Sequence, residues 1–129
     1  MIQEDSYIPK YGIMRAKCHS NQDVNGMIIP NIEIGITYTV DYVIMGRSWS
    51  KVCLSEFPEL EYNTILFTFL IDNEEINLIW DYRALKRLSN DTCRETTLMI
   101  CNDSSEDRMA QIRTKHDNMR IITRSEILQ

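Results

Sequence analysis

The stretch from position 35 to position 70 constrains the fold most, because apolar and polar residues alternate along much of it. Between positions 36 and 44 the alternate residues that would share one face are Ile36, Tyr38, Val40, Tyr42 and Ile44. An alternation of period two in β-branched and aromatic residues is typical of a half-buried strand. A second strand is expected at residues 51–54, after a turn at Gly46, where glycine would permit the positive φ of a tight hairpin.

The end of the same stretch predicts a loop and a third strand. We expect residues 56–63 to form the loop, because Pro58 cannot donate a hydrogen bond to a sheet and Asn63 favours turns. Residues 64–70 are almost wholly apolar, as in a strand that is covered on both faces. The pattern therefore predicts a three-stranded meander as the scaffold of a mainly β (α+β) protein.

Shorter elements are expected on both sides of the meander. Strands are predicted at residues 13–18, 76–80, 96–101 and 119–124, and helices at residues 81–88 and about 106–116. Asp81 would cap the first helix. An alternative continues the second helix through Ile127, but Asp117 and Asn118 are poor helix formers and favour a break.

A boundary near Ser89 would divide the chain into two parts of a single domain. Residues 1–88 are expected to form a β-barrel core with an N-terminal arm, and residues 89–129 an α/β appendage packed on that core. With 129 residues, of which 43% are hydrophobic, one domain is the expected number.

Charge and hydropathy exclude several classes of protein. The net charge of −5 repels nucleic acid and argues against a general DNA or RNA binder. The sequence has no apolar run of about 18 residues and no apolar segment near its beginning, so neither a membrane span nor a signal peptide is predicted. We therefore expect a cytoplasmic protein with reduced thiols.

Residues suited to catalysis or metal binding are few. The four cysteines, Cys18, Cys53, Cys93 and Cys101, form no CxxC pair, so neither a zinc site nor another cofactor is expected. His19 follows Cys18 directly, and adjacent side chains at the end of a strand point to opposite sides, so they form no local nucleophile–base pair. We predict a protein that is not an enzyme. A cysteine-dependent enzyme that uses Cys18 with a distant histidine is an alternative.

Two clusters combine aromatic and basic residues. The first consists of Arg47, Ser48 and Trp49 in the turn after Gly46, and the second of Trp80, Tyr82, Arg83 and Lys86 in and beside the first predicted helix. Tryptophan and arginine are enriched at binding hot spots, and both can stack on a nucleobase. The alternative is structural, with Trp49 as a lid on the sheet and Trp80 buried under a solvated helix face. At one end of a barrel the two clusters would form an aromatic–basic groove.

Four motifs in the meander carry a resemblance to a known group of proteins. They are Y-T-V at 38–40, M-G-R-S-W at 45–49, V-C-L-S-E-F at 52–57 and Y-N-T-I-L-F-T-F at 62–69. In this region, about a quarter of the chain, the sequence resembles small uncharacterised proteins of Firmicutes bacteria and their phages. The resemblance implies a small SH3-like β-barrel or a strongly bent antiparallel sheet, and it implies no catalytic residues. The segment from about Ser89 onward departs from it as an added element.

These features lead to three functional hypotheses. The first is a binding protein of phage or mobile-element type that inhibits a host defence or nucleic-acid-handling protein, because opposite charges steer an acidic chain to a basic surface. The second is a protein that binds or sequesters a nucleotide signal with Arg47, Trp49, Arg83 and Lys86, and the third is the cysteine-dependent enzyme. In addition, pairing of an exposed edge strand at residues 119–124 would give a homodimer.

Overall fold

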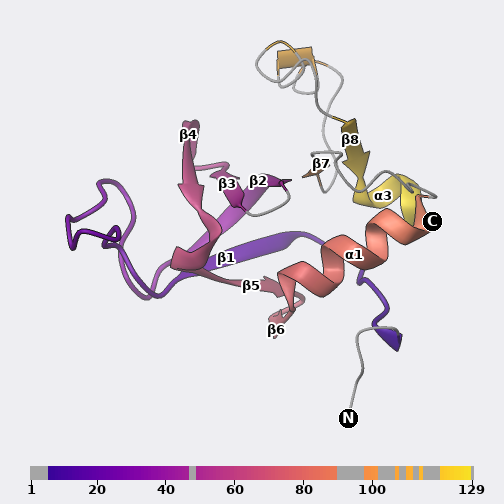
Figure 1. Cartoon of the computed structure of the whole chain (residues 1–129), viewed down its shortest axis with the longest axis horizontal. Helices are drawn as coiled ribbons and strands as arrows, with labels where there is room; N and C mark the ends of the chain where they lie inside the picture. The colour runs from indigo at the N-terminus through magenta and orange to yellow at the C-terminus, as the bar shows by residue number, and fades with distance from the viewer. Residues whose placement is uncertain are drawn as a thin grey trace.

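The fold is mainly β, as the alternation predicts. The computed structural model describes residues 6–46, 49–89, 98–101, 107, 110–111, 114 and 120–128. In chain order its elements are the strands β1 (Met14–Cys18), β2 (Thr37–Met45), β3 (Ser50–Leu54) and β4 (Phe57–Asn63), the 3-10 helix η2 (Thr64–Leu66), the strands β5 (Phe67–Ile71) and β6 (Glu74–Glu75), the helix α1 (Leu78–Leu88), the strands β7 (Leu98–Cys101) and β8 (Arg120–Thr123), and the helix α3 (Arg124–Ile127). Figure 1 shows α1 beside the sheet, with β8 and α3 near its C-terminal end.

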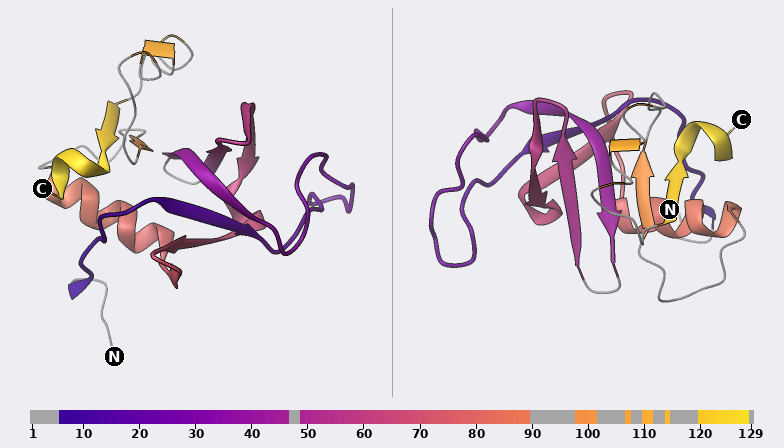
Figure 2. Two further views of the ribbon diagram at one scale, coloured as in Figure 1. Left: turned by 180° about the vertical axis from the view of Figure 1, so that it is seen from behind. Right: turned by 90° about the horizontal axis from the view of Figure 1, so that it is seen from above.

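The strands form one open sheet that is strongly bent. The antiparallel order is β4-β3-β2-β1-β5-β6, and β7 adds antiparallel to β2, with β8 parallel to β7. Residues 37–39 of β2 pair with β1, whereas residues 42–45 pair with both β3 and β7. Because one strand serves two parts of the sheet, the sheet curves around the core, as the two views of Figure 2 show.

A β-bulge bends β2 at its middle. The pairing of β2 with β3 shifts between Val40 and Tyr42, which makes Asp41 the extra residue. An extra residue of this kind bends the strand and increases its local twist. The bend explains how a single strand takes part in both halves of the sheet.

The bulge also reverses the alternation of β2. Before it, even-numbered residues belong to the main core, and after it Val43 and Met45 do. Tyr42 and Ile44, each only 1% exposed, therefore lie on the opposite face of the sheet and are buried there. The expectation that alternate residues from position 36 to position 44 share one face is wrong beyond the bulge.

The segment expected as a loop is a strand instead. β4 tolerates Pro58 because it is an edge strand of the sheet. A proline there can lack its backbone N–H without breaking a hydrogen bond to a neighbouring strand. The turn occurs after β4, where the side chain of Asn63 accepts a hydrogen bond from the backbone N–H of Ile65 at 3.0 Å. The apolar strand therefore begins at Phe67, after η2, and not at Thr64.

Helix α1 begins earlier than the sequence pattern predicts. Its N-cap is Asn77, whose Oδ1 accepts a hydrogen bond from the backbone N–H of Trp80 at 3.1 Å. Residues 78–80, expected at the end of a strand, are thus the first turn of the helix, and β6 is limited to Glu74–Glu75. Asp81 lies inside the helix and does not cap it.

Asp81 forms a buried ion pair with Arg124 instead, and both side chains are fully buried. Nη1 of Arg124 donates to Oδ1 of Asp81 at 3.1 Å, and Nη2 donates to Oδ2. Nη1 also donates to the backbone oxygen of Lys10 at 2.9 Å, and the Tyr7 hydroxyl donates to Oδ1 of Asp81 at 3.2 Å. The pair therefore joins α1, α3 and the N-terminal arm.

Several other expectations were tested by the structure. The strands predicted at 13–18, 96–101 and 119–124 are confirmed as β1, β7 and β8. The helix predicted at about 106–116 lies mostly outside the described residues. Of its members, Asp107, Ala110, Gln111 and Thr114 are helical. In the part of the chain that the structure describes, no helix is long and apolar enough to cross a membrane.

Candidate functional site

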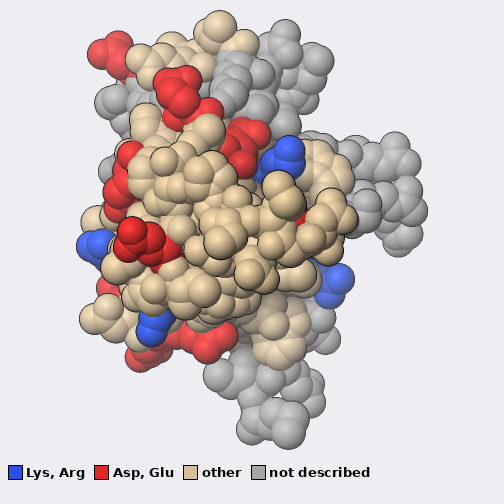
Figure 3. Space-filling model, turned by 90° about the vertical axis from the view of Figure 1, so that its left-hand side faces the viewer, with Lys and Arg blue, Asp and Glu red and all other residues tan. Residues whose placement is uncertain are grey.

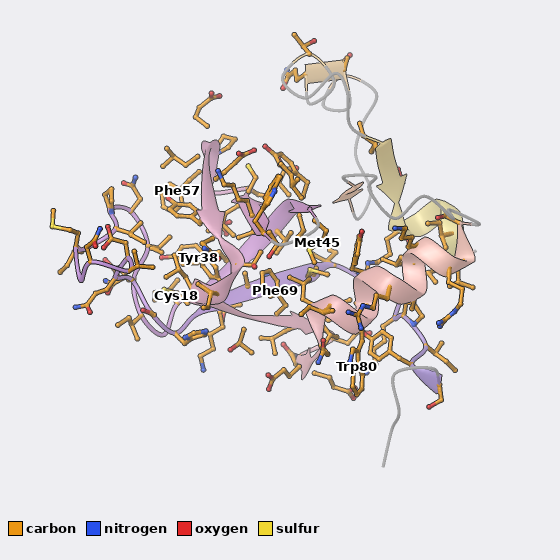
Figure 4. All side chains as sticks on the ribbon, in the orientation of Figure 1. Cys18, Tyr38, Met45, Phe57, Phe69 and Trp80 are labelled. Carbon is orange, nitrogen blue, oxygen red and sulfur yellow. The ribbon has the colours of Figure 1, made fainter. Side chains whose placement is uncertain are left out.

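A groove of about 510 Å³ lies between the sheet and the start of α1, and we call it the Trp49 groove. Its lining comes from β2 to β6, η2 and the first turn of α1, and includes Met45, Trp49, Phe67, Phe69, Glu75 and Ile79. The volume falls in the range of about 300–1,000 Å³ that is usual for ligand sites. Figure 4 labels two of the lining residues, Met45 of β2 and Phe69 of β5.

The groove has a buried apolar floor and an exposed apolar rim. Met45, Phe67 and Phe69 are buried and form part of the floor. On the rim, Trp49 is 48% exposed and Ile65 72% exposed. Ile79 of α1, also on the lining, is 53% exposed. Apolar residues exposed together around one hollow are typical of an interaction site.

Trp49 is held at the groove by a close contact with Gly46. A Cβ added at Gly46 would lie 2.6 Å from Cε2 of the indole and 2.8 Å from its Nε1. The backbone N–H of Gly46 also donates to the carbonyl of Trp49 at 2.9 Å. The glycines with positive φ are Gly12, Gly26 and Gly35, so the expected reason for a glycine at position 46 is wrong. Its role is to let the indole approach the backbone.

The described lining of the groove carries little charge, and that charge is negative. Glu75 is the one charged residue on it, beside a few polar groups such as the hydroxyls of Ser50 and Thr64, which hydrogen bond to each other. A carboxylate beside an apolar floor favours a ligand with an apolar group next to a cation. It disfavours a phosphate.

The structure separates the second predicted cluster from Trp49. Trp80 packs edge to face on Tyr7 of the N-terminal arm, with ring centroids 6.3 Å apart, and Figure 4 shows it on the far side of α1. The ammonium of Lys86 lies 5.9 Å from the ring centroid of Tyr82. Arg83 is exposed on α1. These four residues do not line the groove, as far as its described lining shows.

Two residues of the first cluster, Arg47 and Ser48, lie outside the described residues. Of the predicted site residues, the structure therefore places Trp49 alone at the groove. Ile65, Glu75 and Ile79 were missed by the sequence analysis. Their signal was weak, since each is a single apolar or acidic residue beside a turn.

The cysteine alternative can be compared with the geometry of Cys18. Its side chain is 1% exposed, and its thiol donates to the backbone oxygen of Ser20 at 3.2 Å. Burial raises the pKa of the Cys18 thiol, which favours the protonated form, whereas a nucleophile acts as the thiolate. Among the described residues, no group of three or more His, Cys, Asp or Glu side chains could hold a metal ion.

Comparison with known proteins gives one result. The model of the family described as bacteriophage T4 protein Y07B matches residues 21–89, which are 69 of the 129 residues. The matched range includes all four motifs of the phage-type resemblance and the whole described lining of the groove. No curated protein and no solved structure matches the chain. By this match the chain belongs to the phage family of bacteriophage T4 protein Y07B.

Proposed function

We propose that this phage-type chain is a non-enzymatic binding protein that holds an apolar side chain of a host protein in the Trp49 groove. The observation that carries the proposal is the half-exposed Trp49 above the buried floor of Met45, Phe67 and Phe69. Tryptophan is among the residues that contribute most to protein–protein affinity, and its contribution is largest where water is excluded around it. Ile65 and Ile79 on the rim would exclude that water.

Charge narrows the partner to a basic segment. Glu75 is the charged residue on the described lining, and the whole chain has a net charge of −5. A lysine or arginine beside the apolar anchor would pair with Glu75, and the overall charge would speed association. This chemistry suits an inhibitor that covers a basic surface on a defence or nucleic-acid-handling protein in the host cytoplasm.

The proposal includes an SH3-like barrel for the part of the chain from β1 to β5. It is supported by the strand order β4-β3-β2-β1-β5, by the long loop after β1 and by the 3-10 turn η2 before β5. Small barrels of this type serve many functions, so the fold adds no evidence for the partner. The function rests on the groove.

The test is capture of host proteins on the immobilised chain, with two variants that change the charge equally. Glu75→Lys reverses the charge in the groove, and Glu59→Lys reverses that of an exposed residue of β4 outside it. We expect a stoichiometric partner that is captured less as salt rises, is lost with Glu75→Lys and is retained with Glu59→Lys. Capture that is equal for both variants, or no stoichiometric partner, would contradict the proposal.

A further inference from the structure

The long connection between β1 and β2 offers a second candidate surface, which is rich in exposed apolar residues. This β1–β2 loop occupies positions 19–36, between Cys18 and Thr37, and has 18 residues. Connections of more than about 12–15 residues are uncommon in compact domains and are usually functional or disordered. Figures 1 and 2 show the loop projecting from the end of the sheet that lies away from α1. It contributes no residue to the described lining of the Trp49 groove.

Hydrogen bonds hold the tip of the loop in one shape. Oδ1 of Asp23 accepts from the backbone N–H groups of Asn25 at 2.8 Å and of Met27 at 3.0 Å. The backbone N–H of Gly26 donates to the carbonyl of Asp23 at 3.0 Å, and Gly26 has a φ of 80°, which glycine adopts without strain. The tip is therefore a turn closed by the side chain and the backbone of Asp23.

The base of the loop is anchored to the core. Ile32 is 3% exposed and belongs to the main core, and Ile29 packs against that core. The backbone N–H of Glu33 donates to the Tyr38 hydroxyl at 2.9 Å, and that of Gly35 donates to the carbonyl of Cys18 at 2.8 Å. The loop thus uses part of its apolar residues to fix itself on the sheet.

The remaining apolar side chains of the loop point into solvent. Val24 is 100% exposed, Met27 66%, Ile28 69%, Ile34 62% and Ile36 45%. A preorganised segment loses little conformational entropy when it binds, so exposed apolar groups on such a turn contribute efficiently to affinity. The shape and the exposure together indicate a protrusion that fits a cleft.

The charge of the loop selects the kind of cleft. No lysine or arginine occurs from position 18 to position 46, whereas the loop carries Asp23 and Glu33. In Figure 3, which faces this end of the molecule, uncharged residues fill the centre and charged residues lie around them. Two carboxylates without a cation oppose an anionic membrane, and the net charge of −5 opposes a second copy of the chain. A partner with a basic rim is favoured.

We propose that the β1–β2 loop is a recognition element, which inserts Val24 and Met27 into an apolar cleft of a partner protein whose rim carries lysine or arginine. The inference goes beyond the proposed function, because the loop and the Trp49 groove have no residue in common. The same partner can contact both surfaces, or each surface can have its own.

The first part of the test is photo-crosslinking in a bacterial host lysate. The photoreactive residue p-benzoylphenylalanine is placed at position 24 in one sample and, as a matched exposed control on β4, at position 60 in another. We expect a protein crosslinked through position 24 only, with the crosslink in an apolar cleft bordered by lysine or arginine. A crosslink to a second copy, flotation with phosphatidylglycerol vesicles, or no crosslink specific to position 24 overturns the proposal.

The second part measures the affinity of the purified crosslinked protein for variants of the chain. We expect Val24→Ser and Met27→Ser each to weaken binding about tenfold or more, and Leu60→Ser to leave it unchanged. Asp23→Asn keeps the side-chain oxygen that accepts the hydrogen bonds of the tip and removes the negative charge. Combined with Glu33→Gln, it is expected to make the affinity depend less on salt than it does in the control variant Glu59→Gln. Equal affinity for Val24→Ser and wild type overturns the proposal.

A further variant, Trp49→Ala, distinguishes the loop from the groove. If the crosslink at position 24 survives Trp49→Ala and the affinity still depends on Val24, the loop acts without the groove. The proposed function fails separately, if the partner captured in its own test binds Trp49→Ala and Glu75→Lys as tightly as wild type, and that result leaves the loop proposal intact.

Discussion

At the scale of single residues, the contact between Gly46 and Trp49 determines the shape of the groove. The indole occupies the space that any side chain at position 46 would need. We expect Gly46→Ala to lower the free energy of unfolding by about 1–3 kcal/mol, as overpacking does, and to move the indole. Urea denaturation measures the first effect, and the fluorescence of Trp49 in a Trp80→Phe background measures the second.

The matched control for this prediction is the same change without the indole. In a Trp49→Ala background, Gly46→Ala should cost much less, because the neighbour it collides with is gone. An equal cost in both backgrounds would show that position 46 needs glycine for a reason other than Trp49.

Tyr42 predicts a loss of stability at alkaline pH. Burial, and then the hydrogen bond that its hydroxyl donates to Glu61 at 2.8 Å, raise the pKa of Tyr42 above its ordinary value. Above about pH 10 the unfolded chain releases a proton that the folded chain keeps, so stability falls as pH rises, by up to about 1.4 kcal/mol per pH unit. Tyr42→Phe should therefore reduce this slope in urea denaturations between pH 8 and pH 11.

Ile44→Val serves as the comparison for Tyr42→Phe, because Ile44 is buried on the same face and does not titrate. It is expected to lower stability by about 0.5–1.5 kcal/mol at every pH and to leave the slope unchanged. A slope that Tyr42→Phe does not alter would refute the role of Tyr42.

At the scale of elements, the Asp81–Arg124 ion pair joins α1 to α3. Asp81→Leu or Arg124→Met alone leaves one buried charge without its partner and should cost about 3–5 kcal/mol of unfolding free energy. The double variant should cost far less than the sum, because no buried charge is left. Calorimetry or urea denaturation of the three variants tests this.

The exposed pair of Lys10 and Glu74 provides the control for the buried one. Glu74→Gln should change stability by less than about 1 kcal/mol, since solvent screens an exposed pair. Additive costs of the two single changes at Asp81 and Arg124 would mean that the two charges do not interact in the folded protein.

The elements also show where sequence patterns stop being informative. Strand alternation predicted β1 and the first half of β2 correctly, because each buries one face. The alternation failed beyond Asp41, because one inserted residue exchanges the core-facing and the opposite face of the strand. No residue type in the sequence predicts such a bulge. Pro58 suggested a loop, but an edge strand tolerates proline. The sequence does not show which strand lies at the edge of the sheet, because that position is decided by the tertiary fold.

Asp81 was misassigned for a related reason. At the start of an amphipathic segment an aspartate is usually a cap, and its partner Arg124 is 43 positions away in the sequence. Nothing local distinguishes a buried arginine from a solvated one. The true cap, Asn77, lies among residues whose β-branched and aromatic neighbours resemble a strand.

At the scale of the whole molecule, the strands β7 and β8 extend the sheet beyond residues 21–89, which the family model matches. β7 pairs with β2, and β8 pairs with β7. Among the described residues, β8 has no strand on its other side. The homodimer through residues 119–124 stays a prediction, and sedimentation would detect it as a doubled mass.

The Trp49 groove is also a property of the whole molecule. Trp49 was predicted as a site residue because of its type and its place in a turn. Its neighbours at the groove come from η2, β5, β6 and α1, up to 30 positions later in the chain, and only the folded chain brings them together. Trp80 looked equivalent in the sequence but packs on the N-terminal arm.

The central claim is that Trp49 binds a host protein, and the most direct test is the affinity of the captured partner for two truncations. Trp49→Ala removes the indole from the rim of the groove, and Leu88→Ala removes a similarly exposed apolar side chain of α1 outside the described lining. We predict that Trp49→Ala weakens binding by about 2 kcal/mol, roughly thirtyfold, and that Leu88→Ala leaves it unchanged. Wild-type affinity for Trp49→Ala would contradict the account.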